Sequence, residues 1–267
     1  METCSIDLPL ANFPAQRFEK GVFSSIAESV IKESRLALFV NGNEIVRLLF
    51  APLDPKYLVK GFLLSECLIS GPDDIKELNF NPKSMSVDVK LREELPEHLF
   101  EAVRSVTTGC GRGLTFVPSL FSDFFPQVAG NSKIAPDIII SLMRNLQRIS
   151  EVFRKTGGVH SAAIADGDKI LFACDDIGRH NAVDKILGWQ LEHRWPSDES
   201  LLLLSTGRIS SEIVTKAVRG RFPILVSPSA PTSGAIQVAE SLGVTVIGFA
   251  RGERFNIYTH AHRIIGS

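Results

Sequence analysis

The segment Thr107–Gly113, TTGCGRG, places one cysteine where it could do chemistry. Cys110 lies between Gly109 and Gly111, and Arg112 follows. Flanking glycines give a flexible loop in which a thiol is unhindered, and a nearby guanidinium favours the nucleophilic thiolate. The alternative is a cysteine that merely happens to lie in a loop, although exposed free thiols are usually avoided on protein surfaces. We predict a reactive thiol at this position.

The three other cysteines have different surroundings. Cys4, Cys67 and Cys174 are scattered along the chain, which argues against a disulfide framework and against a zinc site built from paired cysteines. Cys67 lies in KGFLLSECLIS and Cys174 in KILFACDD, and both settings are apolar. We interpret these two as small core residues.

A second group of chemically useful residues follows three strand-like runs in the last third of the chain. LLLLS, PILVS and VTVIGFA alternate with the helical patterns SSEIVTKAVRG and TSGAIQVAESLG, which predicts a parallel, right-handed βαβαβ unit covered by helices. Ligands of such sheets bind outside the carboxyl ends of the strands. The loops at those ends are Ser205–Ser210, Ser227–Ser233 and Phe249–Phe255.

These three loops have the composition of an anion site, and a phosphate-bearing ligand fits it best. Helix N-termini present unpaired N–H groups, loop hydroxyls add donors, and guanidinium forks suit phosphate. In the alternative interpretation the serines only cap helices and the arginines lie on a solvated surface. Three such loops on one sheet edge favour a site. Its candidate side chains are Ser205, Arg208, Ser229, Thr232, Arg251 and Arg254.

The segment Asp175–Lys185, DDIGRHNAVDK, is another polar constellation. Asp176, Arg179 and His180 precede a predicted helix that Asn181 can cap. An aspartate–histidine pair can perform acid–base catalysis. The same residues can equally form a structural hydrogen-bond network that shapes the loop, and we favour that reading.

The elements that must position these residues begin with a small α+β unit over residues 21 to about 92. LALFVN and EIVRLLFA are strands joined by Gly42-Asn43, and LDPKYLVKGFLLSECLI is a helix that Asp54 can cap, with Pro55 in its first turn. IKELNFN and SMSVDVKL are two further strands. The first twenty residues show little periodicity and are expected to form an arm.

The remaining segments link this unit to the parallel strands. EELPEHLFEAVRSV is predicted to be helical and to lead into the Cys110 loop, and APDIIISLMRNLQRISEVFRKTGG to be a helix that ends at its glycine pair. HSAAIADGDKILFACDD is a hairpin that turns at Asp166-Gly167, and NAVDKILGWQLEH is a helix. The expected fold is α/β, with a small α+β domain over residues 1–105 and a main domain over residues 106–267.

Composition excludes several classes of protein. The 267 residues carry 29 Lys and Arg against 30 Asp and Glu, so no bulk basic field favours nucleic acid or an anionic membrane. The N-terminus does not have the pattern of a signal peptide, and IAPDIIISLMRNL, the nearest candidate for a membrane span, is interrupted by Asp137 and Arg144. We expect a cytoplasmic protein that binds neither membranes nor nucleic acid.

Five motifs in order resemble the formate dehydrogenase accessory protein family. They are GGVHSAAIAD, DDIGRHNAVDKILG, STGRIS, SPSAPTS and GFARGERFNIYTH, and the resemblance extends from about Gly109 to His260. It implies a sulfurtransferase that receives persulfide sulfur from a cysteine desulfurase. The sulfur then goes to the bis(molybdopterin guanine dinucleotide) molybdenum cofactor that formate dehydrogenase needs.

The resemblance also implies particular residues and a fold. The reactive cysteine falls on Cys110, and the main domain is expected to be similar to cytidine deaminase and to form a homodimer. GDP would act as a fragment of the cofactor. The cofactor segment falls on Phe249, Ala250, Arg251, Gly252, Glu253 and Arg254.

One position departs from the family pattern. Many members carry two cysteines spaced C-x-x-C, whereas this chain has Gly113 in place of the second. A relay between two thiols in this loop is therefore impossible. Either Cys110 alone carries the persulfide, or part of the activity has been lost.

Two rival functions follow from the same residues. A zinc hydrolase acting on a nucleobase would need H-x-E and P-C-x-x-C, but Ala162 follows His160 at the glutamate position and the second motif is absent. His260 and His262 lack an evident third ligand, so no metal is expected. The second rival is a non-catalytic protein that holds the guanine dinucleotide cofactor or chaperones formate dehydrogenase, and the missing second cysteine favours it.

Overall fold

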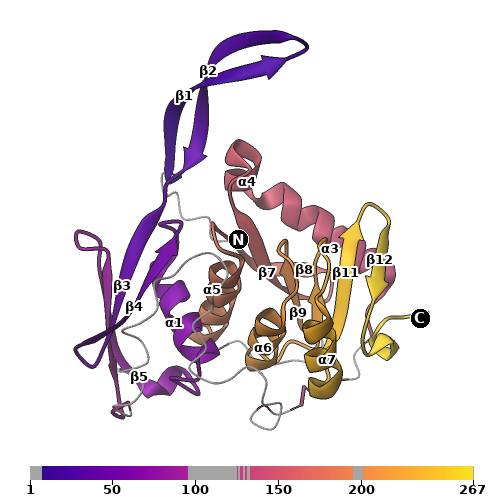
Figure 1. Cartoon of the computed structure of the whole chain (residues 1–267). Coiled ribbons are helices and arrows are strands. Elements are labelled where there is room, and N and C mark those ends of the chain that lie inside the picture. The colour runs from indigo at the N-terminus through magenta and orange to yellow at the C-terminus, as the bar shows by residue number, and fades with distance from the viewer. Residues whose placement is uncertain are drawn as a thin grey trace.

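The computed structural model describes residues 8–95, 125, 127–128, 130, 133–194 and 201–266. Within these residues the chain forms a mixed α/β structure with three sheets: a two-stranded arm, a four-stranded sheet and a six-stranded sheet (Figure 1). The helix predicted just before the Cys110 loop and the boundary expected at residue 105 both lie outside the described residues.

The six-stranded sheet has the order β12-β11-β10-β9-β7-β8. Its strands are β7 (His160–Asp166), β8 (Lys169–Asp176), β9 (Leu201–Ser205), β10 (Ile224–Val226), β11 (Thr245–Arg251) and β12 (Arg254–Ile257). β9, β10 and β11 are parallel, so the predicted βαβαβ unit is confirmed. The β7–β8 hairpin is also confirmed, and β7 adds antiparallel to β9.

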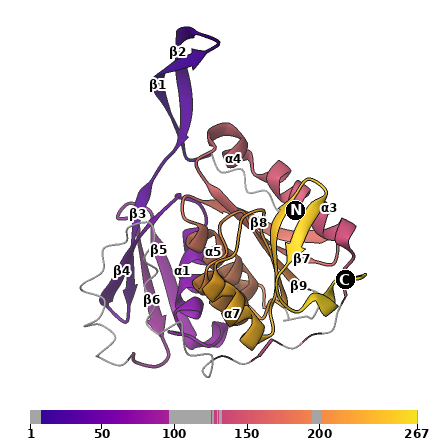
Figure 2. The same cartoon turned by 45° about the vertical axis from the view of Figure 1, so that its right-hand side comes forward.

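Helices cover both faces of this sheet. On one face lie α5 (Arg179–Glu192), α6 (Ser211–Arg219) and α7 (Ser233–Leu242), and α3 (Pro136–Ile149) lies on the other (Figure 1, Figure 2). Alternate residues of a strand point to opposite faces. Leu201 and Leu203 therefore join the core under α5–α7, whereas Leu202 and Leu204 join the core under α3. Burial on both faces explains the unbroken leucine run.

The small α+β unit is confirmed, with corrections at its turns. It contains β3 (Ser34–Val40), β4 (Asn43–Phe50), α1 (Pro55–Ser65), the short 3-10 helix η1 (Pro72–Asp74), β5 (Ile75–Asn81) and β6 (Ser86–Leu91), with strand order β4-β3-β6-β5. The β3–β4 turn is Asn41–Gly42, one residue earlier than predicted, because both residues adopt the positive φ that a tight hairpin needs. Asp54 precedes α1 but its side chain makes no capping hydrogen bond.

The helix predicted across residues 135–156 is broken in two. α3 ends at Ile149 and α4 (Glu151–Thr156) begins after Ser150, whose backbone is extended. The Ser150 hydroxyl caps α4 by accepting from the Phe153 N–H and donates to the Asp175 carboxylate at 2.8 Å. A tertiary hydrogen bond to β8 thus fixes the break. Gly157 ends α4 with positive φ, as the glycine pair predicted.

The first residues form a long hairpin instead of an irregular arm. β1 (Leu10–Glu19) pairs antiparallel with β2 (Val22–Ile31) along its whole length, and the ribbon extends away from the rest of the molecule (Figure 1, Figure 2). Lys20 and Gly21 make the turn, both at positive φ. The prediction of an arm with little periodicity is therefore wrong from Leu10 onward, and residues 22–31 belong to this hairpin.

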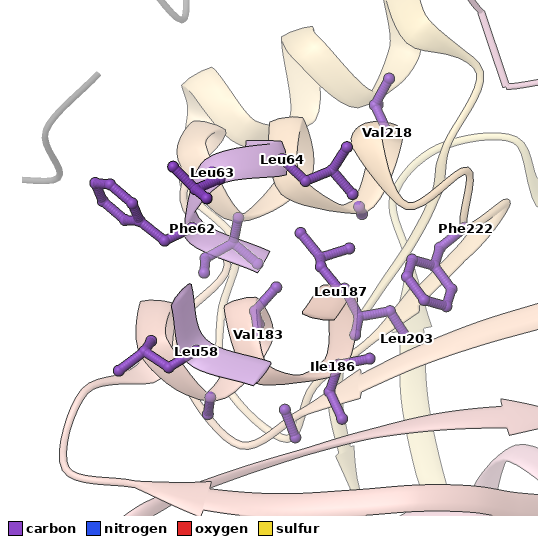
Figure 3. Close-up of a cluster of buried hydrophobic side chains, with 14 of the residues drawn as sticks. Leu58, Phe62, Leu63, Leu64, Val183, Ile186, Leu187, Leu203, Val218 and Phe222 are labelled. Carbon is purple, nitrogen blue, oxygen red and sulfur yellow. The ribbon is translucent and has the colours of Figure 1, made fainter. Parts of the chain in front are cut away.

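The two larger sheets are joined where α1 packs against α5. A methyl group at Gly61 would stand 1.7 Å from the Asp184 carbonyl oxygen, and one at Gly188 would stand 1.9 Å from the Tyr57 carbonyl oxygen. Only glycine at both positions allows the two backbones to approach this closely. Apolar side chains of both helices pack beside this contact and continue toward the sheet (Figure 3); they include Leu58, Leu64, Val183, Leu187 and Leu203.

A buried ion pair adds a third helix to this junction. Lys216 of α6 donates to Asp184 of α5 at 2.5 Å and to the Ser65 hydroxyl at the end of α1 at 2.7 Å. Both charged side chains are almost fully buried. Because a buried charge is costly unless it is paired, this geometry holds α5 and α6 to the C-terminal end of α1.

Replacing Gly61 or Gly188 with alanine should destabilise the fold, because the added methyl group overlaps a carbonyl oxygen of the facing helix. We expect a loss of about 2–4 kcal/mol in the free energy of unfolding, at or above the usual cost of overpacking. Chemical denaturation measures it. Gly234→Ala is the matched control, since nothing lies within 4 Å of a methyl group there and alanine favours a helix. Equal stability of Gly61→Ala and Gly234→Ala would contradict the prediction.

Candidate functional site

The loops that follow β9 and β10 meet at the carboxyl edge of the parallel strands, as predicted. The Ser227 hydroxyl donates to the Gly207 carbonyl oxygen at 2.6 Å, and the Ser229 hydroxyl donates to the Thr206 carbonyl oxygen at 3.1 Å. A backbone hydrogen bond from Ile209 to Ala230 adds to these contacts. Both loops run into helix N-termini, those of α6 and α7.

The third predicted loop is a β-hairpin. Phe249–Arg251 belongs to β11, Arg254 opens β12, and Gly252 at positive φ makes the turn with Glu253. The prediction of a loop across residues 249–255 is wrong because an antiparallel edge strand continues the sheet here. The hairpin still joins the other loops, since the Phe249 N–H donates to the Ser229 carbonyl oxygen at 3.1 Å.

The two predicted arginines of this hairpin lie at its tip. Arg251 and Arg254 are opposite each other in the register and both are exposed. The Arg251 guanidinium lies 5.7 Å from the centre of the Phe249 ring. Ala250 is buried under the sheet, whereas Gly252 and Glu253 are exposed. The hairpin therefore presents two neighbouring guanidinium groups to solvent at the edge where the loops meet.

The hydroxyls of the predicted site are engaged within the protein. The Ser205 hydroxyl accepts from the Gly207 N–H at 3.3 Å, and Thr232 caps α7 by accepting from the Ala235 N–H at 3.2 Å. With Ser229, these side chains hold the loops in shape, while Arg208 is exposed. Binding of an anion by Ser205, Arg208, Ser229 and Thr232 stays a prediction.

The start of β7 lies at the same edge because β7 runs antiparallel to β9. The Thr206 hydroxyl accepts from the Ser161 N–H at 3.0 Å and lies 3.4 Å from His160 Nδ1. The end of β8 lies beside the start of β7, because His160 pairs with Asp176 and Ser161 pairs with Asp175 in the β7–β8 hairpin. The structure therefore brings together His160, the Asp175–Lys185 segment and the STGRIS loop, which the sequence did not show to be neighbours.

A pocket of about 480 Å³ opens at this junction. Its walls come from the end of α3, from α4 and the following glycines, from the start of β7, and from the loops after β8, β9 and β10. The lining residues are Gln147, Phe153, Gly157, Gly158, Val159, His160, Ser161, Ile177, Thr206 and Pro228. The sequence predicted a site at this edge, but it did not predict that α3 and α4 form part of the pocket wall.

Arg179 and His180 lie near His160 in the wall of this pocket. Burial lowers the pKa of His160 below its ordinary value, and the nearby Arg179 and His180 lower it further. The stem of Arg179 lies against Gly207, where any larger residue would collide with it. His180 Nε2 lies 2.9 Å from Glu212 Oε2 at the start of α6, and this hydrogen bond is the main reason that the pKa of Glu212 is lowered.

Asp176 has a structural role in this edge. Its carboxylate is fully buried, lies 2.7 Å from Lys185 Nζ, and accepts from the Gly178 N–H and the Asn181 side-chain amide at 3.0 Å each. The favoured reading of a hydrogen-bond network is therefore confirmed for Asp176. Asn181 does not cap α5, because the helix already begins at Arg179 after Gly178.

The two cysteines that the structure describes lie in different surroundings. Cys110 and Cys4 lie outside the described residues. Cys174 is buried, burial raises its pKa well above the ordinary value, and it is confirmed as a core residue. Cys67 is half-buried at the margin of the core, where burial raises its pKa, so the prediction of a core residue is confirmed only in part for Cys67. His260 donates to the Glu240 carbonyl oxygen at 3.0 Å.

The part of the chain that the structure describes contains neither a metal-binding cluster nor a membrane-spanning helix. There, no three side chains of histidine, cysteine, aspartate or glutamate are grouped so that they could hold a metal ion. No helix in this part is both long enough and apolar enough to cross a bilayer.

Fold and site together define a mixed α/β protein with a pocket beside positive charge at the carboxyl edge of its parallel strands. The chain belongs to the FdhD/NarQ family, whose model matches residues 31–265. It is 39% identical over 258 residues to the "Sulfur carrier protein FdhD" of Bacillus pumilus, an alignment that covers 93% of this chain and 95% of the relative. The protein of the same name from Bacillus subtilis is 38% identical and is covered to 95%.

A solved structure shares the fold. The crystal structure of a candidate formate dehydrogenase accessory protein from Desulfotalea psychrophila superposes with a TM-score of 0.79, at 24% identity, and the match covers 97% of this chain and 100% of that one. The likeness supports the arrangement of sheets and helices described above.

The pKa of His160, measured by NMR titration of its imidazole ring, should lie below the ordinary value of about 6.5. Arg179→Gln should raise it, because one of the positive charges that disfavour the imidazolium is removed. Arg208→Gln serves as the control and should leave the titration unchanged. A pKa at or above the ordinary value in the unaltered protein would mean that burial and positive charge do not act on this ring.

Proposed function

We propose that this protein is a cytoplasmic sulfur carrier required for formate dehydrogenase activity. The observation that carries the proposal is the match along nearly the whole chain to relatives named sulfur carrier proteins. A cysteine desulfurase supplies persulfide sulfur, and Cys110 receives it. The acceptor is the bis(molybdopterin guanine dinucleotide) molybdenum cofactor, and the protein is then a sulfurtransferase with a cysteine persulfide intermediate.

Sulfur uptake needs one thiolate only. The Cys110 thiolate attacks the outer sulfur of the donor persulfide, the donor S–S bond breaks, and the donor cysteine leaves as a thiolate. Sulfur and electrons balance without an added oxidant or reductant. Gly113 removes the second thiol found in many family members, so uptake and delivery occur at the same sulfur. Arg112 replaces part of the activation that a second thiol would give.

The cofactor is the substrate, and its guanine dinucleotide end is proposed to bind at the carboxyl edge. Arg251 and Arg254, adjacent and exposed at the hairpin tip, suit its phosphates. Arg179 adds positive charge at the neighbouring pocket, where the lowered pKa of His160 favours its neutral, hydrogen-bonding form. Of the proposed cofactor segment Phe249–Arg254, the arginines make the ionic contacts, and the rest shapes the turn. Similarity to the cytidine deaminase fold and a homodimeric state belong to the same proposal.

Gly113 also favours a second candidate function. A protein that holds the cofactor, or chaperones formate dehydrogenase without moving sulfur, needs the carboxyl-edge site but no thiol. Cys110 separates the two functions, because only the sulfur carrier depends on it.

Cys110→Ser should abolish the ability of the protein to restore formate dehydrogenase activity in a host that lacks its own accessory protein. The reason is that serine cannot carry a persulfide. Single replacements of Cys4, Cys67 and Cys174 are the matched controls and should each restore activity. Mass spectrometry should also find a persulfide on Cys110 after incubation with a cysteine desulfurase and cysteine. Restoration by Cys110→Ser would replace the sulfur carrier with the cofactor-binding chaperone.

GDP should bind at the carboxyl edge, and Arg251→Ala or Arg254→Ala should weaken it by about 1.5–3 kcal/mol, the value of a hydrogen bond to a charged group. Calorimetric titration measures the change. Arg35→Ala, an exposed arginine on β3, is the control. If both hairpin variants bind GDP as tightly as the control, these arginines do not contact the phosphates.

A further inference from the structure

Positive charge concentrates where α3 meets α4. Residues 144–155, which we call the α3–α4 corner, carry four cations and one anion, a net charge of +3. The cations are Arg144, Arg148, Arg154 and Lys155, the anion is Glu151, and all five side chains are exposed. The whole chain has a formal net charge of -1, so the charge of the corner is a local feature.

The acidic groups nearest to the corner are already paired with other cations. Glu151 forms an ion pair with Lys155 at 2.7 Å. Glu28 belongs to β2, which packs beside α4, and it pairs with Arg17 at 3.1 Å. Within the part of the chain that the structure describes, the three arginines of the corner form no ion pair. Their charge is therefore presented to solvent.

The packing of α3 places two of these arginines side by side. Arg144 and Arg148 are four residues apart, about one helical turn, and so lie on the same side of the helix. A rotation of about 100° per residue places both roughly opposite the buried stripe. That stripe consists of Ile139, Leu142, Met143 and Leu146. The hydrogen bond from Ser150 to Asp175 fixes the angle at which α4 continues, so the corner is organised before a partner binds.

Two large apolar side chains are exposed in the same corner. Ile149 is 43% exposed and Phe153 is 44% exposed. Among the described residues, only three large apolar side chains outside the β1–β2 hairpin are exposed, and these are two of them. The helix dipole favours cations in a last turn, which accounts for Arg148 and Arg154 singly but not for exposed apolar groups between them. Arginine beside aromatic and aliphatic side chains is typical of protein–protein interfaces.

The corner also borders the pocket. Gln147 and Phe153 line the pocket of about 480 Å³, and the half-exposed ring of Phe153 lies at its rim. A protein that binds the corner therefore stands beside the opening of the pocket. It is in a position to take over a ligand that the pocket and the neighbouring carboxyl edge hold.

We propose that the α3–α4 corner docks the protein that receives the cofactor, through an acidic segment of that protein with a large apolar side chain. Carboxylates of the segment bind the guanidinium groups of Arg144 and Arg148 in bidentate pairs. Its apolar side chain packs on Ile149 and Phe153. The corner is small, which suits the transient contact that handing over a ligand requires. The inference rests on the proposed function for the identity of this partner, formate dehydrogenase, whereas docking itself requires no thiol.

The test is binding of the full-length protein to formate dehydrogenase isolated from a host that lacks the accessory protein, measured by surface plasmon resonance. Binding of the unaltered protein should weaken as salt is added. Arg144→Glu with Arg148→Glu should weaken it by on the order of 100-fold, mainly through slower association, because like charges then face the acidic segment. Arg144→Lys with Arg148→Lys retains the charge and should bind within about tenfold of the unaltered protein. Ile149→Ser should weaken binding by about tenfold.

Arg35→Glu with Arg221→Glu is the matched control. It makes the same change of charge at two exposed arginines outside the corner and should bind formate dehydrogenase as the unaltered protein does. Far-UV circular dichroism checks that each variant is folded. Cys110→Ser should bind formate dehydrogenase normally, so a failure of the sulfur-carrier function would leave the docking surface standing. The double glutamate variant of the corner should still bind GDP and still accept persulfide sulfur on Cys110.

Several results would overturn the proposal. If the unaltered protein does not bind formate dehydrogenase, or if the double glutamate variant binds it as tightly as the control, the corner is only a solvated surface. Loss of GDP binding in the double glutamate variant would assign its arginines to the cofactor instead. Loss of binding to a cysteine desulfurase, to phosphatidylglycerol vesicles or to a single-stranded oligonucleotide, with formate dehydrogenase binding unchanged, would assign the corner to that partner.

Discussion

The close contact of α1 with α5 is the constraint on which the rest of the structure depends. Gly61 and Gly188 let the two backbones meet, and this contact joins the four-stranded sheet to the six-stranded sheet. α5 also begins at the carboxyl edge of the large sheet, where its first residues Arg179 and His180 stand beside the pocket. The position of the Arg179 guanidinium at the pocket thus depends on how α5 packs against α1 nearer its other end, at Gly188. The buried pair of Lys185 and Asp176 anchors the Arg179 end of the helix.

The candidate site combines loops that hydrogen-bond to one another with exposed arginines beside them. Hydroxyls of the loops are used to bind neighbouring loops, so the backbone is organised before any ligand arrives. The sequence predicted this edge correctly, since strands that alternate with helices place their carboxyl ends together. It could not show that His160 joins the edge, because that depends on β7 adding antiparallel to β9, a pairing between segments about 40 residues apart. Cys110, the residue on which the predicted chemistry rests, lies outside the described residues.

Elements whose formation depends on local sequence patterns were predicted correctly. Elements that depend on tertiary contacts were not. The βαβαβ unit and the small α+β unit follow from alternating strand and helix patterns, and both are confirmed. The helix break at Ser150 was missed because it depends on a hydrogen bond to Asp175, which no local pattern contains. The hairpin structure of the arm was missed because Lys20–Gly21 is a weaker turn signal than Asn-Gly and because apolar and polar residues do not alternate regularly along its two strands. β12 was missed because it is a short edge strand of four residues.

The distance along the chain between α1 and α5 affects how the protein folds during synthesis. Gly61 and Gly188 are more than 120 residues apart, and a ribosome that adds about 5–20 residues per second completes α5 on the order of ten seconds after α1. Until then the side of α1 that carries Leu58 and Leu64 has no α5 to cover it. The nascent N-terminal half therefore carries an uncovered apolar surface for much of its time on the ribosome. Chains that stall between the two helices are for that reason prone to aggregate and are substrates for chaperones that hold unfolded segments.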